Sequence, residues 1–491
     1  MRRALGACAW LLPIVAGAAT TPDQLVLCYS SELRLMVTLE KGVRNQKCEA
    51  PEGPFRLLVP DPFFGPTLKP RCNKAPVPIE AALAPKPVPS PPLEEMDAAI
   101  QRGIAFLLTV QNENGSWGSP HRTKDLNIYA PVPGSHHAFR AAVTSLCLCA
   151  LIEAGAGADG VQAAIERGEV WMFDHLPQLR RATPEAIYNT WGHAYAIQAL
   201  VRMYERQPED PVRQKAIAQL IRDQMGMLGR FESVDGGWGY YDMRAGAKRP
   251  TSSSLSFVNG TVLVALKEAR DIGIEPDAQV VQRAIAATLR QQKSDFSYLY
   301  GEYLKYWPMR AINRPGGSLG RSQVCNLALR IWDDKNVNDA AIRTWLNRLC
   351  ARDGWLSIGR KRPVPHESWF QVAGYFYYYG HYYAARCIAL LPEEERPFYQ
   401  DQLAHLIAPL QELDGSWWDF PFYNYHQQYG TAFAVMTLLR CRRPAIVTRS
   451  ETPVEPTAPA RPAAAQNKCQ LPEGLHFLRN GLSAVPPEGK R

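Results

Sequence analysis

The chain has 491 residues, of which 46% are hydrophobic, so it is long and apolar enough to bury a large core. Its 55 lysines and arginines outnumber its 47 aspartates and glutamates, which gives a formal net charge of +8. The basic residues form no dense run, and the sequence has no glycine-rich phosphate loop, so a nucleic-acid-binding protein is excluded as the expected class.

The first 18 residues have the pattern of a secretory signal peptide. Residues 1–3 read Met-Arg-Arg, residues 4–16 are largely apolar, and residues 16–18 read Ala-Gly-Ala, a small-residue cleavage pattern. The apolar run is short for a membrane span. We therefore expect a secreted or periplasmic protein without a transmembrane span in its mature chain. An uncleaved membrane anchor is the alternative.

A small N-terminal segment and a proline-rich linker follow the signal peptide. Within residues 19–73, strand-like patterns occur at 24–29, 34–39 and 55–59. Residues 74–92 are rich in proline and are expected to form an extended linker.

The eleven cysteines divide by region. Cys28, Cys48, Cys72 and Cys469 lie outside the apolar helices described below, and an exported chain favours their oxidation to two disulfides. We expect Cys469 to join the N-terminal segment, with the full pairing left open. The cysteines in or beside the apolar helices are expected to be buried free thiols. These are Cys147, Cys149, Cys325, Cys350, Cys387 and Cys441.

A motif recurs from residue 93 onward. Residues 102–117 contain an aromatic–aliphatic pair, a glutamine four residues later, and then a glycine and a tryptophan. Residues 406–417 repeat this order, and shorter copies end at Trp238 and Trp355. Each copy predicts a helix end at which glycine permits a tight turn and glutamine bonds exposed backbone groups. The tryptophan would pack over the junction and keep one donor for a partner.

The copies are spaced by about 60 residues or about twice that, and degenerate copies near Asp174 and Tyr298 fit the same period. Each unit also contains a helix of small and apolar residues, as an inner ring of helices would need. The sequence therefore predicts six helical hairpins. The predicted inner helices are residues 141–154, 190–203, 253–269, 320–332, 372–391 and 429–441.

The motif and its period resemble the QW repeats of squalene and terpenoid cyclases and of protein prenyltransferase β-subunits. The resemblance implies an all-α fold in which residues 93–443 form an α/α toroid of about six helical hairpins. The small N-terminal segment would be an appendage, and the proline- and alanine-rich residues 444–491 a disordered tail. In these families the ligand or substrate occupies the central cavity.

The catalytic motifs of both families are absent from the sequence. Squalene-type cyclases carry Asp-x-Asp-Asp, in which a buried, protonated aspartate attacks an alkene. Protein prenyltransferases bind zinc through Asp-x-Cys and a distant histidine. The adjacent pair Asp333 and Asp334 follows a helix end and is expected to cap it. We therefore assign no metal, and the cofactor is unknown.

Polar residues near the starts of the predicted inner helices are the remaining site candidates. If these helices run parallel around one axis, their N-termini gather at one mouth of the cavity. His193, Asp242 and His381 are the catalytic candidates, although a helix histidine more often has a core or capping role. Asp242 is expected to pair with Arg244. The residues expected to line the mouth and bind the ligand are His193, Asn259, Gln323, Tyr378, His381 and Tyr429.

The favoured interpretation is an exported repeat protein that binds a small apolar or carbohydrate ligand in the toroid cavity. Whether it catalyses a reaction there, and which one, is left open. One alternative is a terpenoid cyclase- or prenyltransferase-type enzyme with non-standard catalytic residues, because aromatic faces stabilise carbocations. The other is a polysaccharide lyase-like enzyme in which aromatic rings stack on sugars. It rests on analogy between folds.

Overall fold

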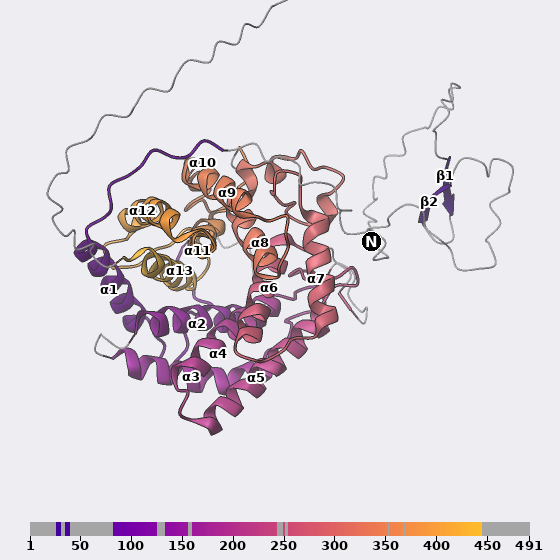
Figure 1. Cartoon of the computed structure of the whole chain (residues 1–491). Coiled ribbons are helices and arrows are strands. Elements are labelled where there is room, and N and C mark those ends of the chain that lie inside the picture. The colour runs from indigo at the N-terminus through magenta and orange to yellow at the C-terminus, as the bar shows by residue number, and fades with distance from the viewer. Residues whose placement is uncertain are drawn as a thin grey trace, which may run out of the picture. The chain divides into compact units, whose positions relative to one another are not determined.

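The computed structural model describes residues 26–30, 35–39, 82–124, 133–155, 160–242, 249–250, 254–351, 353–366 and 369–443. From residue 93 onward the described chain is helical, and six helices form an inner layer (Figure 1). Each inner helix packs on the next, and the last packs on the first, so the layer is a closed ring. The predicted α/α toroid is confirmed. The inner helices are α2 (Ser135–Ala154), α4 (Asn189–Arg206), α6 (Ser256–Asp271), α8 (Leu319–Ile331), α11 (Tyr377–Ile388) and α13 (His426–Cys441).

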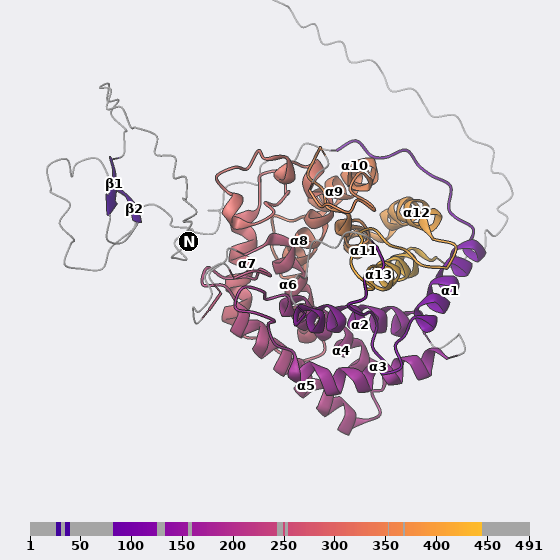
Figure 2. The same ribbon diagram turned by 180° about the vertical axis from the view of Figure 1, so that it is seen from behind.

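The remaining helices follow one another around the outside of this ring, as both views show (Figure 2). Most outer helices pack on the inner helix that precedes them in the chain. The first outer helix, α1, instead packs on α13, so the two ends of the helical unit complete the ring together. The outer helices are α1 (Leu93–Thr109), α3 (Val161–His175), α5 (Pro211–Phe231), α7 (Ala278–Gln291), α9 (Asp339–Ala351), α10 (Asp353–Ser357) and α12 (Arg396–Ile407).

Three repeat tryptophans, Trp117, Trp238 and Trp417, pin the turns between the two layers. Each is fully buried, and its indole N–H donates to a carbonyl ten residues earlier, at the end of an outer helix, over 2.8 to 3.0 Å. The indole N–H, predicted to seek a partner, therefore satisfies a carbonyl group at the end of an outer helix. The backbone N–H groups of the same tryptophans donate to the side chains of Thr144, Asn259 and Thr431 on inner helices.

The repeat glutamines tie neighbouring units together. The amide of Gln111 donates to the carbonyl of Gly115 in its own turn and to that of Ala164 on α3. Gln411 bonds its own turn in the same way and reaches Ala99 on α1. Gly115 has a φ of +86°, and a Cβ there would lie 2.2 Å from a backbone oxygen of α3. The turn therefore requires glycine for both its conformation and its close approach.

The copy that ends at Trp355 lies between an outer and an inner helix as predicted, but its local structure differs from that of the other copies. Residues Asp353–Ser357 form α10, and Trp355 is half-buried with its ring centroid 4.5 Å from that of Phe370. The fourth turn, predicted as a degenerate copy, ends at Tyr298. This tyrosine is fully buried, forms a backbone bridge with Gln292 and accepts a hydrogen bond from its amide at 2.8 Å. The glutamine–aromatic pair therefore persists where the aromatic residue has changed.

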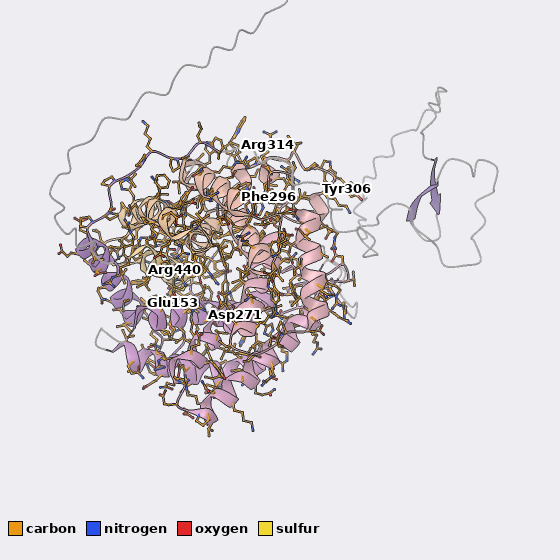
Figure 3. All side chains as sticks on the ribbon, viewed as in Figure 1. Glu153, Asp271, Phe296, Tyr306, Arg314 and Arg440 are labelled. Atoms are coloured by element: carbon orange, nitrogen blue, oxygen red, sulfur yellow. The ribbon has the colours of Figure 1, made fainter. Side chains whose placement is uncertain are left out.

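Ion pairs join the C-terminal ends of five inner helices. Glu153 binds Arg202 at 2.7 Å and Arg440 at 2.5 Å, and Glu268 binds Arg202 at 2.9 Å and Arg386 at 2.5 Å. Glu153 and Arg440 lie close together in Figure 3. Burial alone would raise the pKa of Glu153, but the two arginines lower it to about 2. The pairing shows that these helices run in the same direction, with their C-termini together.

The helical unit buries the predicted free thiols, which are Cys147, Cys149, Cys325, Cys387 and Cys441 on inner helices and Cys350 on the outer helix α9. Among the described helices, α2 alone is long and apolar enough to cross a membrane, with a mean hydropathy of 1.3. In this structure 72% of the apolar stretch of α2 is buried within the protein. A core helix of a folded domain can have the same length and apolar composition as a membrane-spanning helix.

The N-terminal segment contains an antiparallel pair of strands, β1 (Val26–Ser30) and β2 (Leu35–Leu39), in which Cys28 lies opposite Val37. These strands match two of the three predicted pieces. The third piece, the signal peptide at 1–18, Cys48, Cys72, Cys469, Arg244 and the tail from 444 lie outside the described residues.

The end of the proline-rich linker is bound to the helical unit. Residues 82–92 have no regular secondary structure. Its backbone carbonyls accept hydrogen bonds from Asn347 on α9 and Gln402 on α12, and Ser90 donates to Asp401. The linker therefore lies along the outer helices before α1 begins.

Candidate functional site: an aromatic cavity

A cavity of about 180 Å³ lies at the N-terminal ends of the inner helices. Its wall is almost wholly aromatic and contains no charged side chain. Trp191, Tyr240, Tyr375, Phe422 and Tyr429 are half-buried, and most of the other wall residues are buried. The wall consists of Phe139, Ala142, Val143, Leu146, Tyr188, Trp191, Tyr195, Tyr240, Phe257, Tyr375, Phe376, Tyr379, Phe420, Phe422, Tyr429 and Phe433.

The rings of the wall pack edge-to-face and tilted, which holds them in place. Phe257 has its centroid 5.0 Å from Phe376, at an interplanar angle of 82°, and 5.9 Å from Trp191. Such rings present electron-rich faces and polarised edges to the space that they enclose. A dry cavity of about 150 Å³ is enough to hold benzene. The cavity therefore suits a ring or a short branched hydrocarbon segment.

A chain of hydroxyl groups lies along one side of the cavity. The Tyr240 and Tyr300 hydroxyls are 2.5 Å apart, Tyr300 and Tyr375 are 3.3 Å apart, and Tyr375 is 3.2 Å from Nε2 of His366. Burial raises the pKa of Tyr300 and lowers that of His366. Tyr300 and His366 are therefore neutral near pH 7, and the chain of polar groups provides a polar edge to an apolar wall.

Asp419 lies behind the cavity wall and contacts it through a hydrogen bond. The hydroxyl of Tyr429 donates to its Oδ1 at 2.7 Å, and the backbone N–H of Tyr378 donates to its Oδ2 at 3.1 Å. Burial raises the pKa of this carboxyl to about 7, although both hydrogen bonds and the charge of Arg360 act in the opposite direction. Asp419 therefore exchanges a proton near neutral pH, in contact with a wall residue.

Sequence reasoning missed Asp419 because it looked for an acid in the paired motif of a known family. The signal was nevertheless present. Residues 417–425 read Trp-Trp-Asp-Phe-Pro-Phe-Tyr-Asn-Tyr, so one carboxylate is placed among aromatic residues directly after a repeat tryptophan. An isolated acid in such a stretch is costly to bury and has few local partners.

Three of the six residues predicted to bind the ligand face the outer layer or its turns instead of the cavity. Nδ1 of His193 is 2.7 Å from the amide oxygen of Gln224 on α5, and Gln323 donates to the carbonyl of Trp345 on α9 at 3.0 Å. Asn259 accepts from the turn at Trp238, as described above. These side chains turn outward because helix ends and turns offer hydrogen-bond partners, whereas the aromatic cavity does not.

The predicted residues on α11 also lie outside the wall. Nδ1 of His381 is 2.8 Å from the carbonyl of Tyr377 in its own helix, and its ring packs on the Tyr377 ring at 4.5 Å. Tyr378 approaches the site only through its backbone N–H. Of the six residues predicted to bind the ligand, Tyr429 lines the cavity. It is also the residue that contacts Asp419.

The remaining catalytic candidates show no reactive arrangement. Asp242 is fully buried and forms an ion pair with Arg181 at 3.5 Å, and its predicted partner Arg244 lies outside the described residues. Burial lowers the pKa of His193 to about 4, so that its ring is neutral. Within the described ranges, no group of three or more histidines, cysteines or acids is placed to hold a metal ion.

Asp419→Asn should change how stability depends on pH. The carboxyl has an ordinary pKa of 3.8, raised to about 7 in the folded protein. The folded state therefore keeps a proton that the unfolded chain releases, and rising pH favours unfolding. Between about pH 4 and 7, wild-type stability should fall relative to the variant by up to about 1.4 kcal/mol per pH unit. Above that window the difference should be constant.

Urea denaturation of both proteins at a series of pH values measures this difference. Subtracting the two curves cancels the contributions of His193 and His426, whose lowered pKa values act in the opposite direction. A difference that does not vary with pH would show that Asp419 is already ionised in the folded protein at acid pH.

No family model matches the chain. Solved structures similar to it include the apo type II terpene cyclase MstE from Scytonema, at 14% identity and a TM-score of 0.41, covering 72% of this chain and 99% of the cyclase. Another is a structure from Salmonella enterica described as a possible member of the GH105 family, at 13% identity and a TM-score of 0.44, covering 72% and 96%. A substrate complex of MstE holds geranylgeranyl dihydroxybenzoate, at 14% identity and a TM-score of 0.41, covering 71% and 98%.

Proposed function

We propose that the protein is exported by its N-terminal signal peptide and binds an isoprenoid ligand, or the isoprenoid part of one, in the aromatic cavity. The observation that carries the proposal is the composition of the wall, in which aromatic rings surround a space with no charged group. Alkene and methyl groups bury apolar surface against such rings, which is favourable at about 25 cal/mol per Å². The Tyr429 hydroxyl offers one polar contact for the ligand.

A carbohydrate ligand fits this cavity less well. Each sugar hydroxyl buried without a partner costs roughly 1–3 kcal/mol. The lyase alternative requires a base, an acid and a cationic clamp around the substrate, but no histidine or arginine belongs to the wall. The geometry therefore favours the apolar ligand over the sugar.

A proton-initiated cyclisation is the second candidate function, and the Asp419–Tyr429 contact favours it. The neutral Asp419 carboxyl would reverse its hydrogen bond with Tyr429 and donate its proton to the Tyr429 oxygen, while the Tyr429 hydroxyl proton passes to a ligand alkene. A carbon–carbon double bond would be lost, a C–H bond formed, and the carbocation stabilised by the aromatic faces. A second double bond of the ligand would attack this cation and form the ring-closing carbon–carbon bond, and the cyclised cation would return a proton through Tyr429 to the Asp419 carboxylate, which leaves a neutral isomer of the substrate and restores the acid. No co-reactant is required.

Binding can be tested with isoprenoid alcohols of increasing length, namely prenol, geraniol, farnesol and geranylgeraniol. A ligand that binds only the folded state stabilises it, by about 2.7 kcal/mol when the ligand concentration is one hundred times its Kd. This stabilisation is measured as a rise in melting temperature. We expect a rise for the alcohols that fill the cavity and none for glucose or galacturonic acid. A rise with the sugars alone would reject the isoprenoid proposal.

The cyclase candidate is tested by incubating the protein with the same alcohols and analysing hexane extracts by gas chromatography and mass spectrometry. Cyclisation gives products of unchanged mass and altered retention, and Asp419→Asn should abolish them while leaving the melting-temperature rise intact. Binding without isomerised products would support the ligand-binding function and exclude the catalytic one for these substrates.

A further inference from the structure

An exposed aromatic loop follows directly after Tyr300. In the segment 303–314, the side chains of Tyr303, Tyr306, Trp307 and Met309 are 47%, 65%, 62% and 67% exposed. Large apolar residues this exposed and this close in sequence form a patch of the kind that marks an interaction site.

The same loop carries only positive charge. Lys305 lies over the Tyr306 ring at 5.0 Å, and Arg310 and Arg314 are exposed. Tyr306 and Arg314 lie at the edge of the helical unit (Figure 3). No acidic residue occurs in the sequence from Tyr303 to Trp332. The loop therefore offers aromatic and cationic groups together.

Hydrogen bonds hold the loop in this exposed form. The amide of Asn313 donates to the carbonyl of Trp307 at 3.1 Å, and Arg314 donates to that of Met309 at 3.0 Å. The backbone N–H of Trp307 donates to Leu304, which is buried. The exposed rings therefore project from a backbone fixed by its own contacts.

The loop begins beside the cavity. Tyr300, three residues before Tyr303, shares hydroxyl contacts with the wall residues Tyr240 and Tyr375. A second exposed ring, Trp369 at 77%, lies on the neighbouring loop. A Cβ built on Gly317 would lie 2.6 Å from the carbonyl oxygen of Phe370, which shows how closely the two loops approach. The exposed rings and the cavity therefore occupy the same end of the toroid.

We infer that the segment 303–314 docks the protein on an anionic lipid bilayer. Tryptophan and tyrosine favour the headgroup region of a membrane, because their rings are apolar and their N–H and O–H groups remain hydrated. Each lysine or arginine near an anionic surface adds about 1 kcal/mol. Docking in this orientation sets the cavity against the bilayer, from which an apolar ligand enters without crossing water. This last clause rests on the proposed isoprenoid function.

The test is sedimentation of the full chain with vesicles of phosphatidylcholine, with and without phosphatidylglycerol. Wild type should bind the anionic vesicles. Replacing Lys305, Arg310 and Arg314 with glutamine should lower that partition coefficient on the order of a hundredfold. Replacing Tyr306, Trp307 and Met309 with serine should weaken binding to both kinds of vesicle. The matched control replaces three exposed apolar residues elsewhere, Val170, Val212 and Leu413, with serine and should bind as wild type does.

Equal binding by the loop variants and wild type would overturn the proposal, since residues 1–18 are common to all of them. A protein-docking loop would instead appear as self-association, measured by sedimentation velocity without lipid, that the serine variant loses while vesicle binding stays absent. Farnesol binding by the loop variants in solution separates the two proposals. If the loop variants still bind farnesol but no longer bind vesicles, both the isoprenoid proposal and the membrane-docking proposal are supported. If neither wild type nor the variants bind farnesol, only the isoprenoid proposal is rejected.

Discussion

Trp417→Ala should lower the free energy of unfolding by about 3–5 kcal/mol, the usual cost of truncating a large buried aromatic residue. Trp417 is fully buried, and its indole N–H donates to Ile407 at 3.0 Å. Its ring packs between the first and last helices of the unit. A Cβ built on Gly103 in α1 would lie 2.9 Å from the Trp417 ring and 2.8 Å from Val435 in α13. The substitution therefore leaves a cavity where the ring of helices closes.

Urea denaturation followed by circular dichroism measures this loss, and Trp369→Ala is the control. Trp369 is 77% exposed, so its removal should change stability by no more than about 0.5 kcal/mol. If Trp417→Ala were as stable as Trp369→Ala, the repeat tryptophan would be dispensable and the packing described for the turn would be incorrect.

Ala142→Trp should abolish the melting-temperature rise caused by isoprenoid alcohols. Ala142 lies in the wall on α2, and an indole in its place would occupy most of a cavity of about 180 Å³. The added ring has apolar neighbours and open space, so the protein should remain folded. Thermal melting with and without farnesol gives both the stability and the binding of the variant.

Ala163→Trp is the matched control, since Ala163 is exposed on α3 and far from the wall in the fold. This variant should bind farnesol as wild type does. Retention of binding by Ala142→Trp would place the ligand outside the cavity and would remove the main support for the proposed function.

The sequence contained most of the information on the fold. The glutamine and tryptophan of residues 102–117 lie at a helix end as predicted, because their donors have only a few backbone acceptors within reach. Trp355 lies between α9 and α11 as the period predicts, but it is half-buried in a short helix, whereas the degenerate copy at Tyr298 keeps the buried aromatic contact. The type of residue at a repeat position is thus a weaker guide to the turn structure than the buried contact that this residue usually makes.

The site was less accessible from the sequence. The prediction placed His193, Gln323 and other polar residues in the cavity because they begin inner helices. Position along a helix does not, however, decide which face a side chain occupies. The outer layer provides partners for polar groups, so the cavity is left to aromatic residues. Asp419 was not identified because its raised pKa depends on burial by segments distant in sequence.

The pairing of α1 with α13 sets the order in which the chain acquires its structure. Arg442, directly after α13, forms an ion pair with Asp97 on α1, and Gln411 in the turn before α13 donates to Ala99, so residues more than 300 positions apart are joined. A nascent chain therefore holds the apolar stripe of α1 uncovered until its last inner helix leaves the ribosome. Contacts so distant in sequence form slowly, and the incomplete ring exposes surface on which chains aggregate. Synthesis of α13 is thus the step that allows the open row of helices to close into a ring and to bury the apolar surface of α1.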